Sequence, residues 1–169
     1  MSPVVVFVGP PGAGKTTVAD EVAARLGLAV RDTDQDIETS QGVSVQDIFI
    51  DEGEQHFRAL EEQAVATALA EHDGVLSLGG GAVLSPSSRE ALQGHLVIFL
   101  DVGLAAAVRR VGMNSGRPLL LGNVRTQLKN LMDQRRVLYR DVASHTIDTD
   151  ELDAAQVADR AVELIKENA

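Results

Sequence analysis

The 169-residue sequence contains no cysteine and no tryptophan, and its aromatic residues are one tyrosine and four phenylalanines. The absence of cysteine excludes disulfides and thiolate metal ligands. No apolar run approaches the roughly 20 residues that a transmembrane helix requires. The opening MSPVVVFVG lacks the basic segment that begins a secretory signal peptide. We therefore expect one globular domain over residues 1–169, located in the cytoplasm and not bound to a membrane.

Positive charge is scarce: the sequence has 15 Lys and Arg residues and 25 Asp and Glu residues, which gives a net charge of −10. This balance argues against a nucleic-acid or anionic-membrane partner. The few cations are concentrated, since eight of them fall between residues 109 and 140: Arg109, Arg110, Arg117, Arg125, Lys129, Arg135, Arg136 and Arg140. Such a cluster suits a small polyanionic ligand, although a basic helix face in solvent would give the same pattern.

Short β-branched runs alternate with amphipathic helical patterns along the whole chain. The expected strands are Val4–Val8, Leu28–Arg31, Val75–Leu78, His95–Leu100 and His145–Ile147. The expected helices are Lys15–Leu26, Asp34–Gln41, Gly53–Ala70, Ser85–Gln93, Leu104–Val111, Thr126–Ala143 and Asp153–Glu167, with a mobile loop over Gly112–Asn123. This alternation predicts an α/β fold of three layers, in which helices cover both faces of a parallel sheet. Ligands of such sheets bind beyond the carboxyl ends of the strands.

The segment GPPGAGKT, from Gly9 to Thr16, matches the phosphate-binding pattern G-x4-G-K-[ST] and lies between an expected strand and an expected helix. In this motif backbone N–H groups and the helix N-terminus face phosphate oxygens. Lys15 would then reach the β- and γ-phosphates, and Thr16 would offer its hydroxyl to Mg²⁺. A fortuitous glycine-rich turn is the alternative. The motif in this context indicates a nucleoside triphosphate as phosphate donor.

Two acids, Asp32 and Asp34, follow the second expected strand and can point into the same cleft. One could hold a water of the Mg²⁺ shell, and the other could accept a proton from an acceptor hydroxyl. Asp34 could instead only cap the following helix. A further acid, Asp101, ends the run LVIFLD and resembles a magnesium-binding acid, but we interpret it as a structural cap for the next helix.

Three arginines and a glycine run are candidates for recognising the acceptor, because guanidinium groups bind carboxylates and phosphates in a fork. Arg58 lies on an expected helix, where pairing with nearby glutamates is the alternative role. Arg117 lies in the loop, where it could close over the γ-phosphate. Arg136 lies on the basic helix. The run Gly79–Gly81 would let an acceptor approach the backbone closely, or it could be a simple turn.

Taken together, these segments resemble the shikimate kinase family in order and spacing over nearly the whole chain. The matching segments are GPPGAGKTT, RDTDQDIE, IFIDEGEQHFRALEEQA, LSLGGGAVL, SGRPLL and RRVLYRDVA. The resemblance implies a P-loop kinase with a five-stranded parallel sheet like that of nucleoside monophosphate kinases. It implies transfer of the γ-phosphate of ATP to the 3-hydroxyl of shikimate, a step toward chorismate and the aromatic amino acids. It also implies a mobile lid at about 112–123 and an acceptor-binding helical segment at about 34–62.

The same resemblance implies roles for individual residues. The ATP-binding positions would be Gly12, Ala13, Gly14, Lys15, Thr16, Thr17, Arg110 and Arg117. The shikimate-binding positions would be Asp34, Arg58, Gly79, Gly80, Gly81 and Arg136. Thr16 would ligate Mg²⁺ directly and Asp32 through water, while Lys15, Asp34 and Arg117 would be catalytic. Where relatives often place an Arg or Pro near the adenine, this chain has Asp150–Asp153, so only a backbone contact is expected there.

From the residues alone, the chemistry is phosphoryl transfer to a small, anionic alcohol. A gluconate kinase or a nucleoside monophosphate kinase of the same architecture would satisfy that description. A module that senses ATP without transferring phosphate is the alternative outside the enzymes. We expect a monomer, because no long apolar stripe is left exposed.

Overall fold

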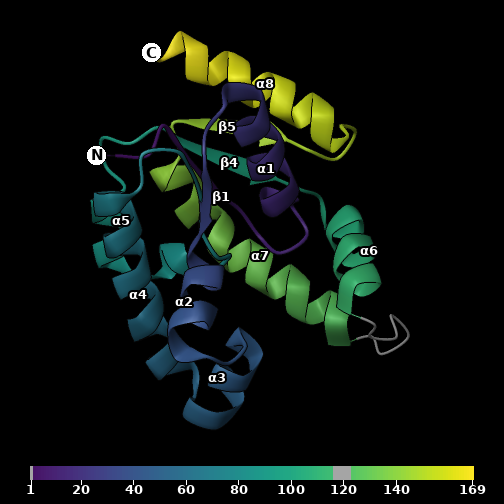
Figure 1. Cartoon of the computed structure of the whole chain (residues 1–169). Helices are drawn as coiled ribbons and strands as arrows, with labels where there is room; N and C mark the ends of the chain where they lie inside the picture. The colour runs from purple at the N-terminus through teal and green to yellow at the C-terminus, as the bar shows by residue number, and fades with distance from the viewer. Residues whose placement is uncertain (1, 116–122) are drawn as a thin grey trace.

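Five parallel strands form one sheet in the order β2-β3-β1-β4-β5 (Figure 1). The computed structural model describes the backbone of residues 2–115 and 123–169, and the side chains outside 111–124. The strands are β1 (Val5–Val8), β2 (Val30–Asp32), β3 (Val75–Ser77), β4 (Val97–Asp101) and β5 (His145–Asp148). The central strand β1 is buried along its whole length, as its VVFV run predicts. The predicted parallel sheet is confirmed.

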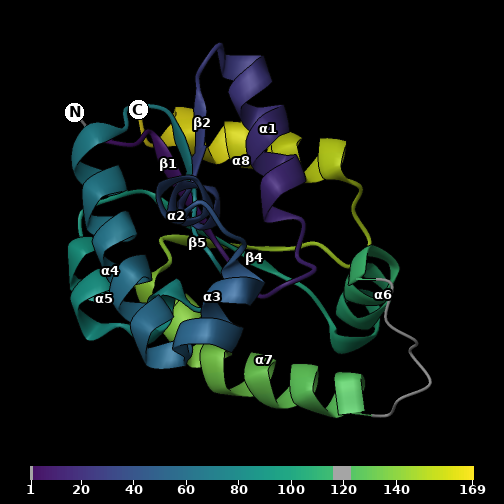
Figure 2. The same cartoon turned by 60° about the horizontal axis from the view of Figure 1, so that its bottom comes forward.

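Helices cover both faces of this sheet, so the predicted three layers are confirmed as well (Figures 1 and 2). One face packs on α1 (Lys15–Leu26), α6 (Leu104–Ser115) and α8 (Ala154–Glu167) through a cluster that includes Val5 and Phe7. The other face packs on α4 (Glu54–Glu71) and α7 (Asn123–Val142) through a cluster that includes Val6 and Val8. Successive side chains of β1 therefore serve opposite layers, as the period of a strand requires.

A smaller group of helices extends beyond the carboxyl edge of the sheet. It consists of α2 (Thr33–Gln41), α3 (Val45–Glu52) and the first half of α4. Ile37, Ile48 and Phe57 form its buried cluster. Helix α3 was not predicted from the sequence, because it is only 8 residues long and depends on the Ser44 cap and on burial of Ile48. These helices make up the segment between residues 34 and 62, and Asp34 at its start lines the same pocket as the phosphate loop.

The short helix η1 (Ala82–Leu84) and helix α5 (Pro86–Ala91) connect β3 to β4. The predicted loop 112–123 is wrong at both ends, because α6 continues to Ser115 and α7 already begins at Asn123. The rest of that loop, with the predicted lid and Arg117, lies outside the described residues. Within residues 2–115 and 123–169, no helix combines the length and apolar composition needed to cross a bilayer.

Candidate active site

The phosphate loop connects β1 to α1 and takes the conformation that its glycines permit. Gly9 passes so close to β4 that a Cβ there would lie 2.6 Å from the Leu100 carbonyl oxygen. Gly14 stands at the N-cap of α1 with φ 86°, a left-handed conformation that favours glycine. The loop and the first turn of α1 line a pocket of about 540 Å³. This pocket is large enough for a nucleotide and opens at the carboxyl edge of the sheet.

Lys15 is the first residue of α1, and its ammonium group folds back on the backbone of this loop. Its Nζ donates to the carbonyl oxygens of Gly9 at 2.6 Å and Pro10 at 3.1 Å. Burial lowers the pKa of Lys15 from 10.5 to about 8, against the opposing effect of the Asp34 and Asp32 carboxylates. The ammonium is therefore charged at neutral pH and close to both acids.

Asp32 and Asp34 have different roles although they are only two residues apart. Asp32 caps α2, since its Oδ1 accepts hydrogen bonds from the N–H groups of Asp34 at 2.8 Å and Gln35 at 3.2 Å. The alternative in which Asp34 is the cap is thus wrong. The Asp34 carboxylate lines the pocket and accepts no hydrogen bond from the described residues. Burial, reinforced by the charges of Asp32 and Glu61, raises the pKa of Asp34 from 3.8 to about 6.

The residues at this edge fit a magnesium ion that is shared with a nucleotide. Thr16 and Asp32 line the same pocket, and the hydrogen bonds to Asp32 use only its Oδ1. In the described part of the chain, no group of three or more His, Asp or Glu side chains could hold a metal by itself. Mg²⁺ needs no such group, because it usually keeps several waters and binds one or two protein oxygens together with substrate phosphates.

The glycine run Gly79–Gly81 follows β3 and has most of its backbone groups paired. The Gly79 N–H donates to the buried Thr33 hydroxyl at 3.2 Å, and the Gly80 carbonyl accepts from the Tyr139 hydroxyl at 2.6 Å. The Gly79 and Gly81 carbonyls accept from the N–H groups of Ala82 and Leu84, both in η1. Among the described residues, nothing accepts from the N–H groups of Gly80 and Gly81. The run therefore offers two backbone donors to a ligand.

Arg58 lies on α4 beside this glycine run. Its guanidinium donates to Glu61 at 2.7 Å and stacks on the rings of Phe49 and Phe57, at 5.7 Å and 5.4 Å from their centroids. The Glu61 side chain is only 4% exposed, and burial raises its pKa while Arg58 opposes that effect. A Cβ on Gly81 would collide with the Arg58 guanidinium. The pair is therefore no ordinary surface pair, because Glu61 is buried and fixes one edge of the guanidinium.

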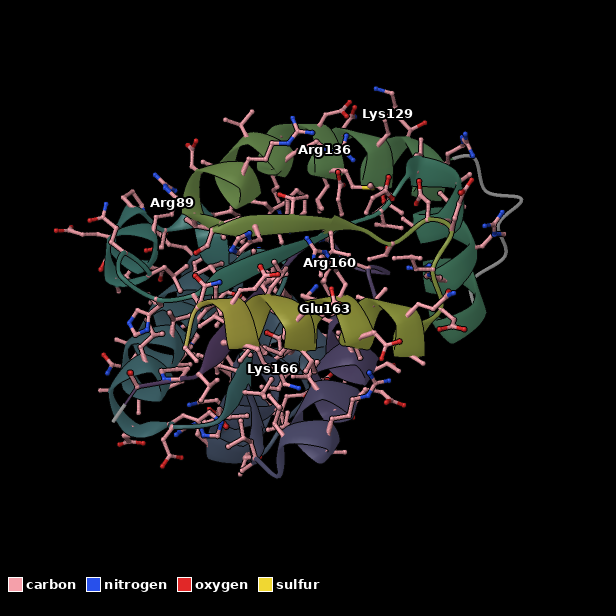
Figure 3. All side chains as sticks on the ribbon, turned by 90° about the horizontal axis from the view of Figure 1, so that it is seen from above. Arg89, Lys129, Arg136, Arg160, Glu163 and Lys166 are labelled. Carbon is pink, nitrogen blue, oxygen red and sulfur yellow. The ribbon has the colours of Figure 1, made fainter. Side chains whose placement is uncertain are left out.

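Arg136 does not face this pocket, which corrects the sequence prediction. Its guanidinium donates to Asp101 Oδ1 at 3.1 Å and to the Val102 carbonyl at 3.4 Å. Arg136 is labelled in Figure 3. Asp101 is accordingly no helix cap either, since it accepts from Arg136 and from the Val102 N–H, and α6 begins only at Leu104. Arg136 thus ties α7 to the end of β4.

The neighbouring Arg135 takes the place expected of Arg136. Its Nη1 lies 3.6 Å from where a Cβ of Gly80 would be, and its charge lowers the pKa of Lys15 and Glu61. Adjacent residues of a helix differ in direction by about 100°, so only one of the two arginines can face the loop. Arg135 shares its helix face with the buried Leu128, Met132 and Tyr139. That spacing of four, three and four is a signal in the sequence that could have found it.

Arg110 stands at the other end of the pocket. It donates to the Gly12 carbonyl at 2.9 Å and to the Thr149 carbonyl at 3.4 Å, so it connects the phosphate loop to the chain after β5. Leu152 and Asp153 line the same end. The Asp153 N–H is already bonded to Gln156 in the capping box of α8. Leu152 and Asp153 therefore line this end of the pocket, and the Asp153 N–H is not available to a ligand there.

The pocket thus brings together most of the residues singled out from the sequence. Its lining includes Gly12, Ala13, Gly14, Lys15, Thr16, Thr17, Asp32, Asp34, Gly79, Gly80 and Arg110. Arg58 and Gly81 lie next to it, Arg136 does not, and Arg117 lies outside the described residues.

Known proteins resemble this chain in both sequence and fold. The family model described as "Shikimate kinase" matches residues 11–166. The chain belongs to the shikimate kinase family. The shikimate kinase of Salinispora arenicola is 56% identical over 158 residues, which cover 94% of this chain and 95% of that protein. The shikimate kinase of Streptomyces coelicolor is 48% identical over 165 residues, covering 98% and 96%.

Solved structures of shikimate kinases confirm the P-loop kinase fold. The structure of shikimate kinase from Acinetobacter baumannii in complex with shikimate superposes with a TM-score of 0.90 at 35% identity. The superposition covers 99% of this chain and 94% of the Acinetobacter baumannii chain. The shikimate kinase of Aquifex aeolicus has a TM-score of 0.80 at 24% identity and covers 97% and 96%, which supports the fold alone.

Proposed function

We propose that this protein is an ATP-dependent shikimate kinase, which transfers the γ-phosphate of ATP to the 3-hydroxyl of shikimate and releases shikimate 3-phosphate and ADP. The observation that carries the proposal is the meeting of Lys15 and Asp34 in one pocket with the glycine run beside them. Membership of the shikimate kinase family supports shikimate as the acceptor rather than another small alcohol.

The phosphate loop would hold the triphosphate. Backbone N–H groups of residues 12–17 and the N-terminus of α1 would receive its oxygens, and Lys15 would leave the Gly9 and Pro10 carbonyls to bind the β- and γ-phosphates. Thr16 and Asp32 would hold Mg²⁺, Asp32 through water. When bound, Mg²⁺ neutralises charge that develops on the phosphate oxygens. Arg110 would lie along the adenine.

The acceptor would bind beside the glycine run, between helix α4, which carries Arg58, and helix α7, which carries Arg135. Shikimate is a carboxylate, and Arg58 and Arg135 flank the glycine run with their guanidinium groups. The free N–H groups of Gly80 and Gly81 could complete its coordination by hydrogen bonds. We assign to Arg135 the carboxylate-binding role that the sequence suggested for Arg136.

Asp34 would then orient the 3-hydroxyl toward the γ-phosphorus. As the hydroxyl oxygen forms its bond to phosphorus, the bond from the γ-phosphorus to the β,γ-bridging oxygen breaks and the hydroxyl proton passes to Asp34. A pKa of about 6 leaves Asp34 ionised at neutral pH yet basic enough to accept that proton. Lys15 would balance the negative charge on the phosphates during transfer.

We further propose that residues 1–169 act as one kinase domain and as a monomer, with residues 34–62 as the acceptor-binding segment. The phosphate loop, the two acids and the start of the glycine run line one pocket, which supports a single kinase domain. Because the reaction consumes ATP, we place it in the cytoplasm. The substrates are small molecules, and the net charge of −10 disfavours a nucleic-acid partner.

A panel of acceptors tests the proposal. ADP release is measured at saturating MgATP with shikimate, gluconate or nucleoside monophosphates, and without acceptor. We expect release to depend on shikimate. Turnover confined to gluconate or to a monophosphate would assign another acceptor, and ATP binding with no acceptor-dependent turnover would indicate a sensor.

The adjacent arginines provide a matched pair of variants. Arg135→Ala is expected to raise the KM for shikimate by about 10- to 100-fold, because it removes a charged hydrogen bond. Arg136→Ala should leave that KM within about 2-fold and instead lower Tm, since the charge on Asp101 loses its partner. The reverse outcome would return the acceptor role to Arg136.

A further inference from the structure

Tyr139, the only tyrosine of the chain, is 1% exposed and joins α7 to the glycine run. Its ring stacks on Phe99 of β4 with the centroids 5.0 Å apart. Packing alone would be satisfied by a phenylalanine at this position. The hydroxyl, however, donates a hydrogen bond of 2.6 Å to the Gly80 carbonyl. Since a buried hydroxyl without a partner is destabilising, this bond indicates a specific role for the phenol.

The bond fixes the direction of one peptide group in the glycine run. The described chain has no cis peptide bond, and in a trans peptide the carbonyl and the following N–H point in opposite directions. Because the Gly80 carbonyl points toward Tyr139, the Gly81 N–H points away from it. Glycines have little to restrain their rotation except such bonds. Tyr139 thus holds the Gly81 N–H in place as a donor.

The same hydroxyl lies beside Arg135, which precedes Tyr139 by one turn on the same face of α7. The phenol gives its only proton to the Gly80 carbonyl, so its oxygen keeps only acceptor capacity toward a neighbouring donor such as Arg135. Burial raises the pKa of Tyr139 to about 12, and the charge of the nearby Arg135 guanidinium opposes this rise. The hydroxyl is thus bonded to the glycine run, and Arg135 lies beside the same run, with its Nη1 3.6 Å from where a Cβ of Gly80 would be.

We propose that Tyr139 is a positioning residue for a carboxylate-bearing acceptor. Its hydroxyl holds the Gly80–Gly81 peptide and the Arg135 guanidinium in register, so that the backbone donor and the guanidinium reach the same carboxylate. Tyr139 itself does not line the pocket of the phosphate loop. The inference rests on the proposed function, since shikimate supplies the carboxylate.

Tyr139→Phe removes the hydroxyl and keeps the ring stacked on Phe99. We expect the KM for shikimate, and its dissociation constant by calorimetry without nucleotide, to rise about 3- to 10-fold. The kcat and the KM for ATP should stay within about 2-fold, because a lost uniform binding interaction affects KM alone. Leu164→Ala, in α8 on the other face of the sheet, is the control for lost stability and should leave shikimate binding unchanged.

A double-mutant cycle with Arg135→Ala tests the coupling. The effect of Tyr139→Phe on the dissociation constant should be smaller in the Arg135→Ala background than in the wild type. Equal effects in both backgrounds, or a lower Tm with unchanged shikimate binding, would overturn the proposal. Wild-type protein that binds and phosphorylates no shikimate would instead refute the proposed function, so the two failures are distinguishable.

Discussion

Replacing Asp34 by Asn is expected to stabilise the protein and inactivate it at the same time. The pKa of Asp34 rises from 3.8 to about 6, mainly because the carboxylate is buried. An acid whose pKa is higher in the folded state binds its proton more tightly there, so its ionisation opposes folding. This penalty is absent below pH 3.8, grows up to about pH 6 and is constant above it. Asn has nearly the same shape and carries no charge.

The size of the stabilisation follows from the two pKa values. The interval from 3.8 to about 6, at about 1.4 kcal/mol per pH unit, sets a ceiling of about 3 kcal/mol. Because the pocket is open to water, screening reduces this, and we expect about 1 to 2 kcal/mol at neutral pH. For a chain of this size that corresponds to a rise in Tm of about 3 to 6 °C without ligands.

Asp36→Asn is the matched control, because it makes the same change in net charge on the same helix. Asp36 accepts a hydrogen bond of 2.6 Å from Arg31, so its replacement should lower Tm or leave it unchanged, with kcat near wild type. Asp34→Asn should lower kcat by about 10²- to 10⁴-fold, the range for a lost general base. Thermal unfolding and ADP release measure both effects. An Asp34→Asn protein that is less stable than wild type, or that keeps wild-type turnover, would refute the reasoning.

Three other predictions follow from the pocket. The kcat/KM should fall below about pH 6, where Asp34 gains a proton, and above about pH 8, where Lys15 loses one; a profile without either limb would contradict these assignments. Arg110→Ala should raise the KM for ATP and spare that for shikimate, and initial rates with each substrate varied would show the difference. Gly81→Ala should raise the KM for shikimate by displacing Arg58, whereas unchanged kinetics would mean that no acceptor approaches there.

Local patterns were enough to predict the part of the fold around the phosphate loop. The apolar run of β1, the glycines after it and the amphipathic pattern of α1 lie next to one another in the sequence. Helix α1 begins and ends at the predicted residues, Lys15 and Leu26. A phosphate-binding GKT motif lies between a strand and a helix, so the motif and the apolar patterns around it both predict β1 and α1.

The acceptor side depends on contacts between distant segments, and there the sequence was less informative. The choice between Arg135 and Arg136 depends on the rotation of α7, which Leu128, Met132 and Tyr139 set by their burial. The family resemblance pointed to Arg136, whereas the arginine that lies beside the glycine run is Arg135, one residue earlier on the same helix.

Which acid caps α2 was also ambiguous in the sequence, because Asp32 directly precedes that helix and Asp34 lies in its first turn. Only the backbone geometry shows that Asp32 accepts the N–H groups of the first turn. Asp34 is thereby left to the pocket. The role of Thr33 between them, whose buried hydroxyl accepts from the Gly79 N–H, depends on the pairing of β2 with β3 and was not predicted.

The most direct measurement follows the phosphate itself. Protein, Mg²⁺, shikimate and ATP labelled at the γ-phosphate are incubated together, and the labelled products are separated. Our account predicts that the label leaves ATP and appears in shikimate 3-phosphate in a one-to-one ratio with ADP. Label that appears only as inorganic phosphate, or that stays in ATP, would contradict it.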